Sequence, residues 1–185
     1  MKVYFVGAHS TGKSTLARYV SETYKIPLLT EVARMVLSEK ELQVDSLRYN
    51  LDTVDDYQRS IFLRQLEEEN KAEFVADRSL IDCLSYSAEH SRILPELLAH
   101  PALINYIAKL SEPGSILFFV RPSKATLHAD GVRESINWES IVKIDAQIKF
   151  LIEMWGLRYF QINTDSMQER VRLVNAVLSF IPSGN

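Results

Sequence analysis

The chain of 185 residues contains a single cysteine, Cys83, which excludes an internal disulfide and a metal site built from cysteines. It also lacks a surplus of basic residues, and its formal net charge is -3. This charge argues against a broad basic face that binds nucleic acid. No apolar run is long enough to cross a bilayer. The opening residues, MKVYFV, are too short for the core of a signal peptide. The sequence therefore predicts a cytoplasmic protein without a membrane partner.

Short apolar runs alternate with stretches of helical periodicity along the chain. Strands are predicted near residues 3–6, 26–30, 74–76, 115–120 and 159–162. Helices are predicted over residues 13–24, 54–72, 79–90, 95–110 with a division at Pro101, 141–155 and 166–180. This alternation is typical of βαβ units, which build a mostly parallel sheet covered by helices on both faces. No linker divides the chain, so we expect residues 1–185 to form a single α/β domain.

Residues 7–14, GAHSTGKS, fit the phosphate-loop pattern G-x-x-x-x-G-K-[ST] in full. An apolar strand precedes the loop and a helix follows it, which is the context that the motif requires. Glycines let the backbone approach a polyphosphate, and successive N–H groups point at it from the positive end of the helix. Lys13 is predicted to reach the β- and γ-phosphates, Ser14 to bind Mg²⁺ and Thr15 to reach the α-phosphate.

Other loop residues are predicted to line the nucleotide: Gly7, His9, Ser10, Thr11 and Gly12. A catalytic base is an alternative role for His9. Its place among the variable positions of the motif favours the lining role. Two further features are predicted to be structural, namely Cys83 as a small packed residue and residues 67–69, EEE, as a solvated helix face.

A carboxylate and an arginine follow the predicted strand at residues 74–76. Asp77 stands at the carboxyl end of that strand, where ligands collect in an open α/β sheet. It is a candidate to organise a metal ion or to receive the acceptor hydroxyl, and Arg78 could bind a phosphate or the acceptor. The structural alternative is that Asp77 caps the next helix, although Ser79 is the more natural cap.

Two polar segments follow other predicted strands. Glu31 and Arg34 are three residues apart and share a face on a helix, either as an ordinary ion pair or as contacts to the acceptor. Their place after the second strand favours the acceptor. Residues 121–135, RPSKATLHADGVRES, contain a turn-forming Asp-Gly pair and Arg133, as expected of a flap that closes over the nucleotide. A plain solvated loop would look the same, so both interpretations stay open.

Together, the phosphate loop, Glu31-x-x-Arg34, Asp77-Arg78-Ser79 and Asp130-Gly131-x-Arg133 resemble the P-loop nucleoside and nucleotide kinases, thymidylate-kinase-like in the broad sense. The pattern is similar to the ribosylnicotinamide kinase domains of bacterial NAD regulators and their phage-borne relatives. Those domains share the E-x-x-R pattern and an acidic-aromatic helix that ends in Gln, here residues 55–65. The resemblance covers nearly the whole chain in order.

The resemblance implies a P-loop kinase fold, with a five-stranded parallel sheet in the order 2-3-1-4-5 and helices on both faces. It implies a lid over about residues 123–136, which would carry Arg133. ATP and Mg²⁺ are the implied donor and cofactor. The adenine would lie near the turn formed by Asn163, Thr164 and Asp165.

The resemblance also implies roles for single residues. Lys13, Asp77 and Arg133 would be catalytic, and Ser14 and Asp77 would hold the metal. The residues that would face the acceptor are Glu31, Arg34 and Arg78.

The predicted function is ATP-dependent phosphoryl transfer to a nucleoside or nucleoside monophosphate. The acceptor stays open because deoxynucleoside kinases usually have Glu in place of Asp77, and thymidylate kinases an aromatic residue or His in place of Ser79. One alternative is a phage-type kinase of a hydroxymethyl-modified base in DNA. Another is a regulatory or motor ATPase, which is less favoured because Arg78, not a second acid, follows Asp77. The oligomeric state stays open, a homodimer included.

Overall fold

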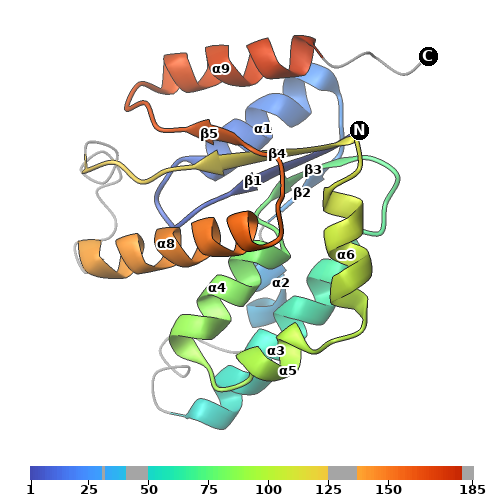
Figure 1. The fold of residues 1–185 in the computed structure, drawn as a ribbon, viewed down its shortest axis with the longest axis vertical. Helices are drawn as coiled ribbons and strands as arrows, with labels where there is room; N and C mark the ends of the chain where they lie inside the picture. The colour runs from blue at the N-terminus through green and yellow to red at the C-terminus, as the bar shows by residue number, and fades with distance from the viewer. Residues whose placement is uncertain (31, 41–49, 125–136, 181–185) are drawn as a thin grey trace.

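Five short apolar segments pair side by side as the strands of one parallel sheet (Figure 1). In the computed structural model, which describes residues 1–30, 32–40, 50–124 and 137–180, the strand order is β2-β3-β1-β4-β5. The strands are β1 (Lys2–Val6), β2 (Leu28–Leu29), β3 (Phe74–Asp77), β4 (Ser115–Val120) and β5 (Phe160–Ile162). The predicted order 2-3-1-4-5 is therefore confirmed.

Helices fill the segments between the strands. Within the described ranges they are α1 (Lys13–Tyr24), α2 (Val32–Glu39), α3 (Leu51–Glu68), α4 (Leu80–His90), α5 (Leu94–Leu98), α6 (Ala102–Leu110), α8 (Trp138–Met154) and α9 (Met167–Ser179). The predicted division at Pro101 separates α5 from α6. Helix α3 begins earlier than predicted because the Asn50 side chain accepts hydrogen bonds from the N–H groups of Asp52 and Thr53. None of these helices has both the length and the apolar character that crossing a bilayer requires.

The helices cover both faces of the sheet (Figure 1). Helices α1 and α9 lie on one face and pack against strand residues such as Val3 and Phe5. Helices α3, α4, α6 and α8 lie on the other face, where Tyr4 and Phe119 point. Consecutive strand residues point to opposite faces, so a sheet that is buried on both faces needs continuous apolar strands. This requirement explains why the strands are visible in the sequence as short apolar runs.

The carboxyl ends of all five strands meet at one edge of the sheet, at the left in Figure 1. The phosphate loop follows β1 at this edge, and Asp77 is the last residue of β3. Residue 121 follows β4, and the predicted adenine turn at residues 163–165 follows β5. The parallel topology therefore gathers the predicted site segments that the structure describes.

The acidic run at residues 67–69 is not the uniformly solvated face that the sequence predicts. Glu67 is exposed, but Glu69 is only 4% exposed. The Gln65 amide donates a hydrogen bond of 2.6 Å to Glu69 Oε1. Burial raises the pKa of Glu69 to about 8, although Gln65 and Tyr106 act to lower it. The sequence could not reveal this burial, because Tyr106, which belongs to a distant helix, helps to enclose the carboxyl.

We expect Glu69→Gln to remove a pH dependence of stability. The folded chain keeps the Glu69 proton up to a pH of about 8, whereas the unfolded chain releases it near the ordinary value of 4.5. The stabilisation that this residue provides is therefore complete below pH 4.5 and is lost as the pH rises toward 8. Across this window the free energy of unfolding of the wild type should fall relative to the variant by on the order of 1 kcal/mol per pH unit.

Urea unfolding at several pH values between 5 and 8 measures this difference. The matched control is Glu67→Gln, an exposed change in the same acidic run, which should follow the wild-type profile. If the Glu69→Gln profile also followed the wild type, Glu69 would be ionised in the folded chain and the expectation would be wrong.

Candidate active site

Two glycines determine the shape of the phosphate loop between β1 and α1. Gly7 has a φ of +151° and Gly12 a φ of +86°, conformations that residues with side chains rarely adopt. A Cβ at residue 7 would stand 2.3 Å from the carbonyl oxygen of Val120, so the end of β4 leaves space for glycine alone. Ser10 also has a positive φ, of 57°. These residues together curve the backbone before α1 begins.

The N-terminus of α1 is open to an anion. Its N-cap residue, Gly12, provides no side-chain cap, and the first turn of α1 contains no acidic residue. Ser14 and Thr15 in that turn are exposed. The first N–H groups of a helix have no partner within the helix and carry partial positive charge, so this end attracts phosphate groups.

The ammonium group of Lys13 lies inside the curve of the loop. Lys13 is only 4% exposed, and its Nζ donates hydrogen bonds to the carbonyl of Ala8 and, at 3.2 Å, to Thr11 Oγ1. Thr11 Oγ1 donates in turn to the same Ala8 carbonyl at 3.0 Å. The loop therefore concentrates positive charge where the motif predicts phosphates.

Asp77 ends β3 beside the phosphate loop. It stands in register with Phe5 of the neighbouring strand β1, which leads directly into the loop. Its Oδ1 is buried and has no hydrogen-bond partner among the described residues. The cap of α4 is Ser79, whose Oγ accepts from the Ile81 N–H at 3.1 Å, so Asp77 does not cap this helix. A buried carboxylate oxygen without a donor is unfavourable, and a cation or a hydroxyl group would satisfy it.

Asp82 joins α4 to the phosphate loop. Asp82 is 1% exposed, and its Oδ1 accepts a hydrogen bond of 3.1 Å from the Gly7 N–H. Its Oδ2 accepts one of 2.9 Å from the Ser79 N–H, which completes a capping box with Ser79. Burial raises the pKa of the Asp82 carboxyl, while Arg78, Lys13 and the two N–H donors act to lower it. Sequence analysis missed this residue, although the Ser79-x-x-Asp82 spacing is a capping-box signal.

His9 and Arg78 meet on one aromatic side chain of α4. His9 Nδ1 lies 2.9 Å from the hydroxyl of Tyr86. The Arg78 guanidinium lies over the Tyr86 ring, 5.0 Å from its centroid, and its Nη1 is 3.9 Å from Asp82 Oδ1. The backbone of Arg78 has a φ of +90°, which is uncommon for a residue with a long side chain. The structure therefore brings the loop and the β3–α4 turn together at Tyr86.

Of the two predicted acceptor residues that follow β2, the structure describes only one. Arg34 lies on α2 and is exposed. Glu31 lies outside the described residues, as do residues 125–136 of the predicted lid, including Arg133. A shared acceptor site for these residues stays a prediction.

Arg121, which opens the polar segment after β4, has a structural partner. Its Nε donates to Asp145 Oδ1 at 2.9 Å, and its Nη2 lies 2.6 Å from Oδ2. Asp145 belongs to α8 and is 3% exposed. Burial raises the pKa of Asp145, whereas Arg121 acts to lower it. This bidentate pair fixes the beginning of the segment against α8.

The predicted adenine turn after β5 is held by α9. Asn163 is exposed, while the Thr164 hydroxyl donates a hydrogen bond to the Glu169 carboxylate. Arg170 Nε donates a hydrogen bond of 2.6 Å to the Thr164 carbonyl, and its Nη1 donates to the carbonyl of Thr11 in the phosphate loop. Sequence analysis missed Arg170, because nothing in its local pattern distinguishes it from a surface arginine on a helix.

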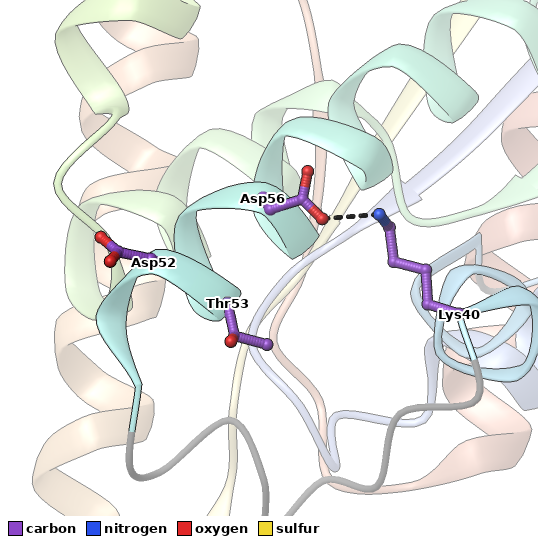
Figure 2. Close-up of a pocket in the computed structure, with 4 residues that line it drawn as sticks. All are labelled: Lys40, Asp52, Thr53 and Asp56. Carbon is purple, nitrogen blue, oxygen red and sulfur yellow. Dashed lines mark hydrogen bonds and ion pairs between the residues drawn. The ribbon is translucent and has the colours of Figure 1, made fainter.

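A surface pocket of about 460 Å³ lies where α2 ends and α3 begins (Figure 2). It is lined by Lys40, Asp52, Thr53 and Asp56. Lys40 forms an ion pair of 2.6 Å with Asp56, and Asp52 accepts a hydrogen bond of 2.5 Å from Arg92. Its charged groups already have partners and none belongs to the phosphate loop, so we assign no function to this pocket.

Comparisons with known proteins establish the family and the fold. A family model described as AAA domain matches residues 2–170. None of the curated proteins compared with the chain matches it. The structure of NadR protein in complex with NR has a TM-score of 0.74 and 18% identity, over 99% of this chain and 52% of that one. Deoxyadenosine kinase from M. mycoides with bound dCTP has a TM-score of 0.71 and 16% identity, over 97% and 99%.

A third similar structure, shikimate kinase from Acinetobacter baumannii in complex with shikimate, has a TM-score of 0.56 and 13% identity, over 96% of this chain and 93% of that one. Identities this low establish a shared fold and no more. The neighbours and the strand order confirm the predicted resemblance and fold class. The chain has the P-loop kinase fold and, with its model matched over residues 2–170, belongs to the AAA domain family.

Proposed function

We propose that the chain is a kinase that transfers the γ-phosphoryl group of ATP to a hydroxyl of a nucleoside or nucleoside monophosphate. The observation that carries this proposal is the buried Oδ1 of Asp77, which has no hydrogen-bond partner among the described residues and stands beside the phosphate loop. A phosphate loop by itself only binds nucleotide. A transferase also needs a group at the metal or at the acceptor oxygen, and Asp77 is placed for that role.

The phosphate loop would hold the donor. The N–H groups of the loop and of the first turn of α1 would bind the phosphates, with Lys13 at the β- and γ-groups. Ser14 and Asp77 would hold Mg²⁺, which supplies positive charge to the phosphate oxygens when bound. No cluster of three or more His, Cys, Asp or Glu in the described ranges could hold a metal by itself. Phosphate oxygens and water would therefore complete the coordination, as Mg²⁺ prefers.

Transfer would break the bond between the γ-phosphorus and its bridging oxygen and form a bond to the acceptor oxygen. The alternative role of Asp77, in place of binding the metal, is to orient the acceptor hydroxyl and receive its proton. Lys13 would balance the charge on the moving group, together with Arg133 once the lid closes. The adenine would lie by Asn163 and Thr164.

The acceptor would contact the segments after β2 and β3, through Glu31, Arg34 and Arg78. Two of the structures with the same fold are a deoxyadenosine kinase and a protein in complex with NR, which supports a nucleoside or its monophosphate. Arginine suits a monophosphate, because its planar guanidinium binds phosphate oxygens in pairs. The carboxylate of Glu31 would suit the hydroxyl groups of a neutral nucleoside.

Lys13→Ala should remove most of the phosphoryl transfer activity and leave the fold intact. The transferred group would lose its compensating ammonium, which costs on the order of 3 kcal/mol of barrier, or about a hundredfold in rate. Transfer of label from γ-labelled ATP measures the rate, and circular dichroism checks the fold. Arg18→Ala, an exposed change on the same helix, is the control. Turnover near that of the wild type in folded Lys13→Ala would contradict the assignment of the loop.

Asp77→Asn should lower the transfer rate by at least about a hundredfold and weaken ATP binding much less. It should lower the free energy of unfolding less than a change at a carboxylate whose two oxygens both have donors, because Oδ1 of Asp77 has no hydrogen-bond partner among the described residues. Asp82→Asn is the contrast, since both its carboxylate oxygens accept N–H bonds. That change should cost about 1–3 kcal/mol of stability. Loss of stability without loss of rate in Asp77→Asn would indicate a structural carboxylate.

Arg34→Ala distinguishes the two acceptor classes. If the acceptor is a monophosphate, its KM should rise by roughly tenfold or more, since one charge-assisted contact of about 1.5–3 kcal/mol is lost. If it is a nucleoside, Arg34→Ala should change KM little and Glu31→Gln should be the damaging substitution. Indifference to both changes would place the acceptor on other segments.

The assay panel contains nucleosides, nucleoside monophosphates and hydroxymethyl-base DNA, each with labelled ATP. Label in the polymer would support the modified-base alternative. Fast ATP hydrolysis without any acceptor would support an ATPase, since a kinase excludes water until its lid closes.

A further inference from the structure

Arg170 is fully buried beneath the phosphate loop. It belongs to α9, which lies on the same face of the sheet as α1 (Figure 1). Its Nε donates a hydrogen bond of 2.6 Å to the Thr164 carbonyl, and its Nη1 donates to the Thr11 carbonyl. Its Nη2 is also buried and has no hydrogen-bond partner in the part of the chain that the structure describes. One side chain therefore joins the phosphate loop to the turn after β5.

The charge of Arg170 is poorly balanced by the protein. Both of its hydrogen bonds go to neutral carbonyl groups. Burial lowers the pKa of the guanidinium, and Asp165, an exposed residue, offsets this effect in part. A buried cation without a bonded anion is costly, and arginine stays charged at physiological pH. An anion bound to the phosphate loop would supply the missing charge.

A carbonyl group of the phosphate loop needs a hydrogen-bond donor on the side where Arg170 lies. Thr11 stands between Ser10 and Gly12, which have left-handed φ values of 57° and 86°. In such turns successive N–H groups point to one side and form a hollow that binds anions, so carbonyl groups are left to find donors elsewhere. Arg170 Nη1 is the donor for Thr11. It would lie 3.4 Å from a Cβ at residue 12, so the guanidinium is in contact with the back of the loop.

We propose that Arg170 is a positioning residue for the nucleotide donor. It holds the carbonyl of Thr11 behind the loop, so that the N–H groups face the phosphates, and it ties the loop to the base-side turn at Thr164. The polyphosphate balances the arginine charge from the other side of the loop. This inference rests on the proposed function only in that the loop binds a polyphosphate. Binding of a base at the turn after β5 should then strengthen binding of phosphates at the loop, and the reverse should also hold.

Binding of magnesium tripolyphosphate, measured by calorimetry, tests the link without any catalytic step. Arg170→Met should weaken binding at least tenfold. The matched control is Arg172→Met, which makes the same change of charge at an exposed position of the same helix and should stay within twofold of the wild type. Arg170→Met with wild-type affinity would overturn the proposal.

A second variant separates the charge from the bridge. Arg170→Lys keeps the charge, but a single ammonium group cannot replace two nitrogen atoms that bond separate segments. We expect at least a fivefold loss of affinity relative to the folded control Arg172→Lys. Wild-type affinity in Arg170→Lys would overturn the positioning role.

The unmodified protein provides a test that no folding defect can obscure. Saturating adenosine, which has no phosphate, should slow hydrogen exchange at the amides of residues 11–14 as well as at the turn after β5. Protection confined to that turn would overturn the link through Arg170. If the wild type bound neither magnesium tripolyphosphate nor ADP, the loop assignment and the proposed function would both be wrong. If the wild type bound them and the Arg170 variants bound them equally well, only this inference would be wrong.

Discussion

One buried carboxylate connects the parts of the candidate site. Asp82 accepts the N–H of Gly7 with one oxygen and the N–H of Ser79 with the other. The first residue of the phosphate loop and the N-terminus of α4 therefore share one anion. Because β1 and β3 are neighbours in the sheet, this link closes a short path from the end of β3 to the loop. Asp77 lies on that path, between its strand partner Phe5 and the Ser79 N–H that Asp82 binds.

Opposite charges hold the loop from the two faces of the sheet. Asp82 of α4 binds a backbone donor at the start of the loop, and Arg170 of α9 binds a backbone acceptor at Thr11. At residue 7 the Val120 carbonyl of β4 leaves no space for a Cβ, so only glycine fits there. These three constraints shape the loop before any nucleotide arrives. Groups fixed in advance bind a developing charge without reorganising, which is the form of electrostatic assistance that phosphoryl transfer needs.

The sequence predicts the parts of this structure that local patterns determine. Apolar runs mark the strands, and the loop motif marks the phosphate site, because a few adjacent residues carry all the information that each requires. Glu69 and Arg170 are residues whose surroundings local sequence patterns do not predict. Each looks like a surface charge on a helix, and each is buried by segments distant in the chain. Asp82 falls between these cases, since its capping box is visible in the sequence but its bond to Gly7 is not.

Arg78 and Ser10 adopt backbone conformations that glycine would occupy without strain. For other residues the left-handed region costs about 1–2 kcal/mol. At residue 78 the side chain offsets part of that cost, because its guanidinium lies over the Tyr86 ring and its Nη1 is 3.9 Å from Asp82 Oδ1. At residue 78 the backbone conformation and the side-chain contacts therefore favour different amino acids. A redesign scored on backbone conformation alone would place glycine at both positions, and the guanidinium beside Asp82 would be lost. A design method that keeps Arg78 has to count its contacts with Tyr86 and Asp82 as well as its backbone conformation.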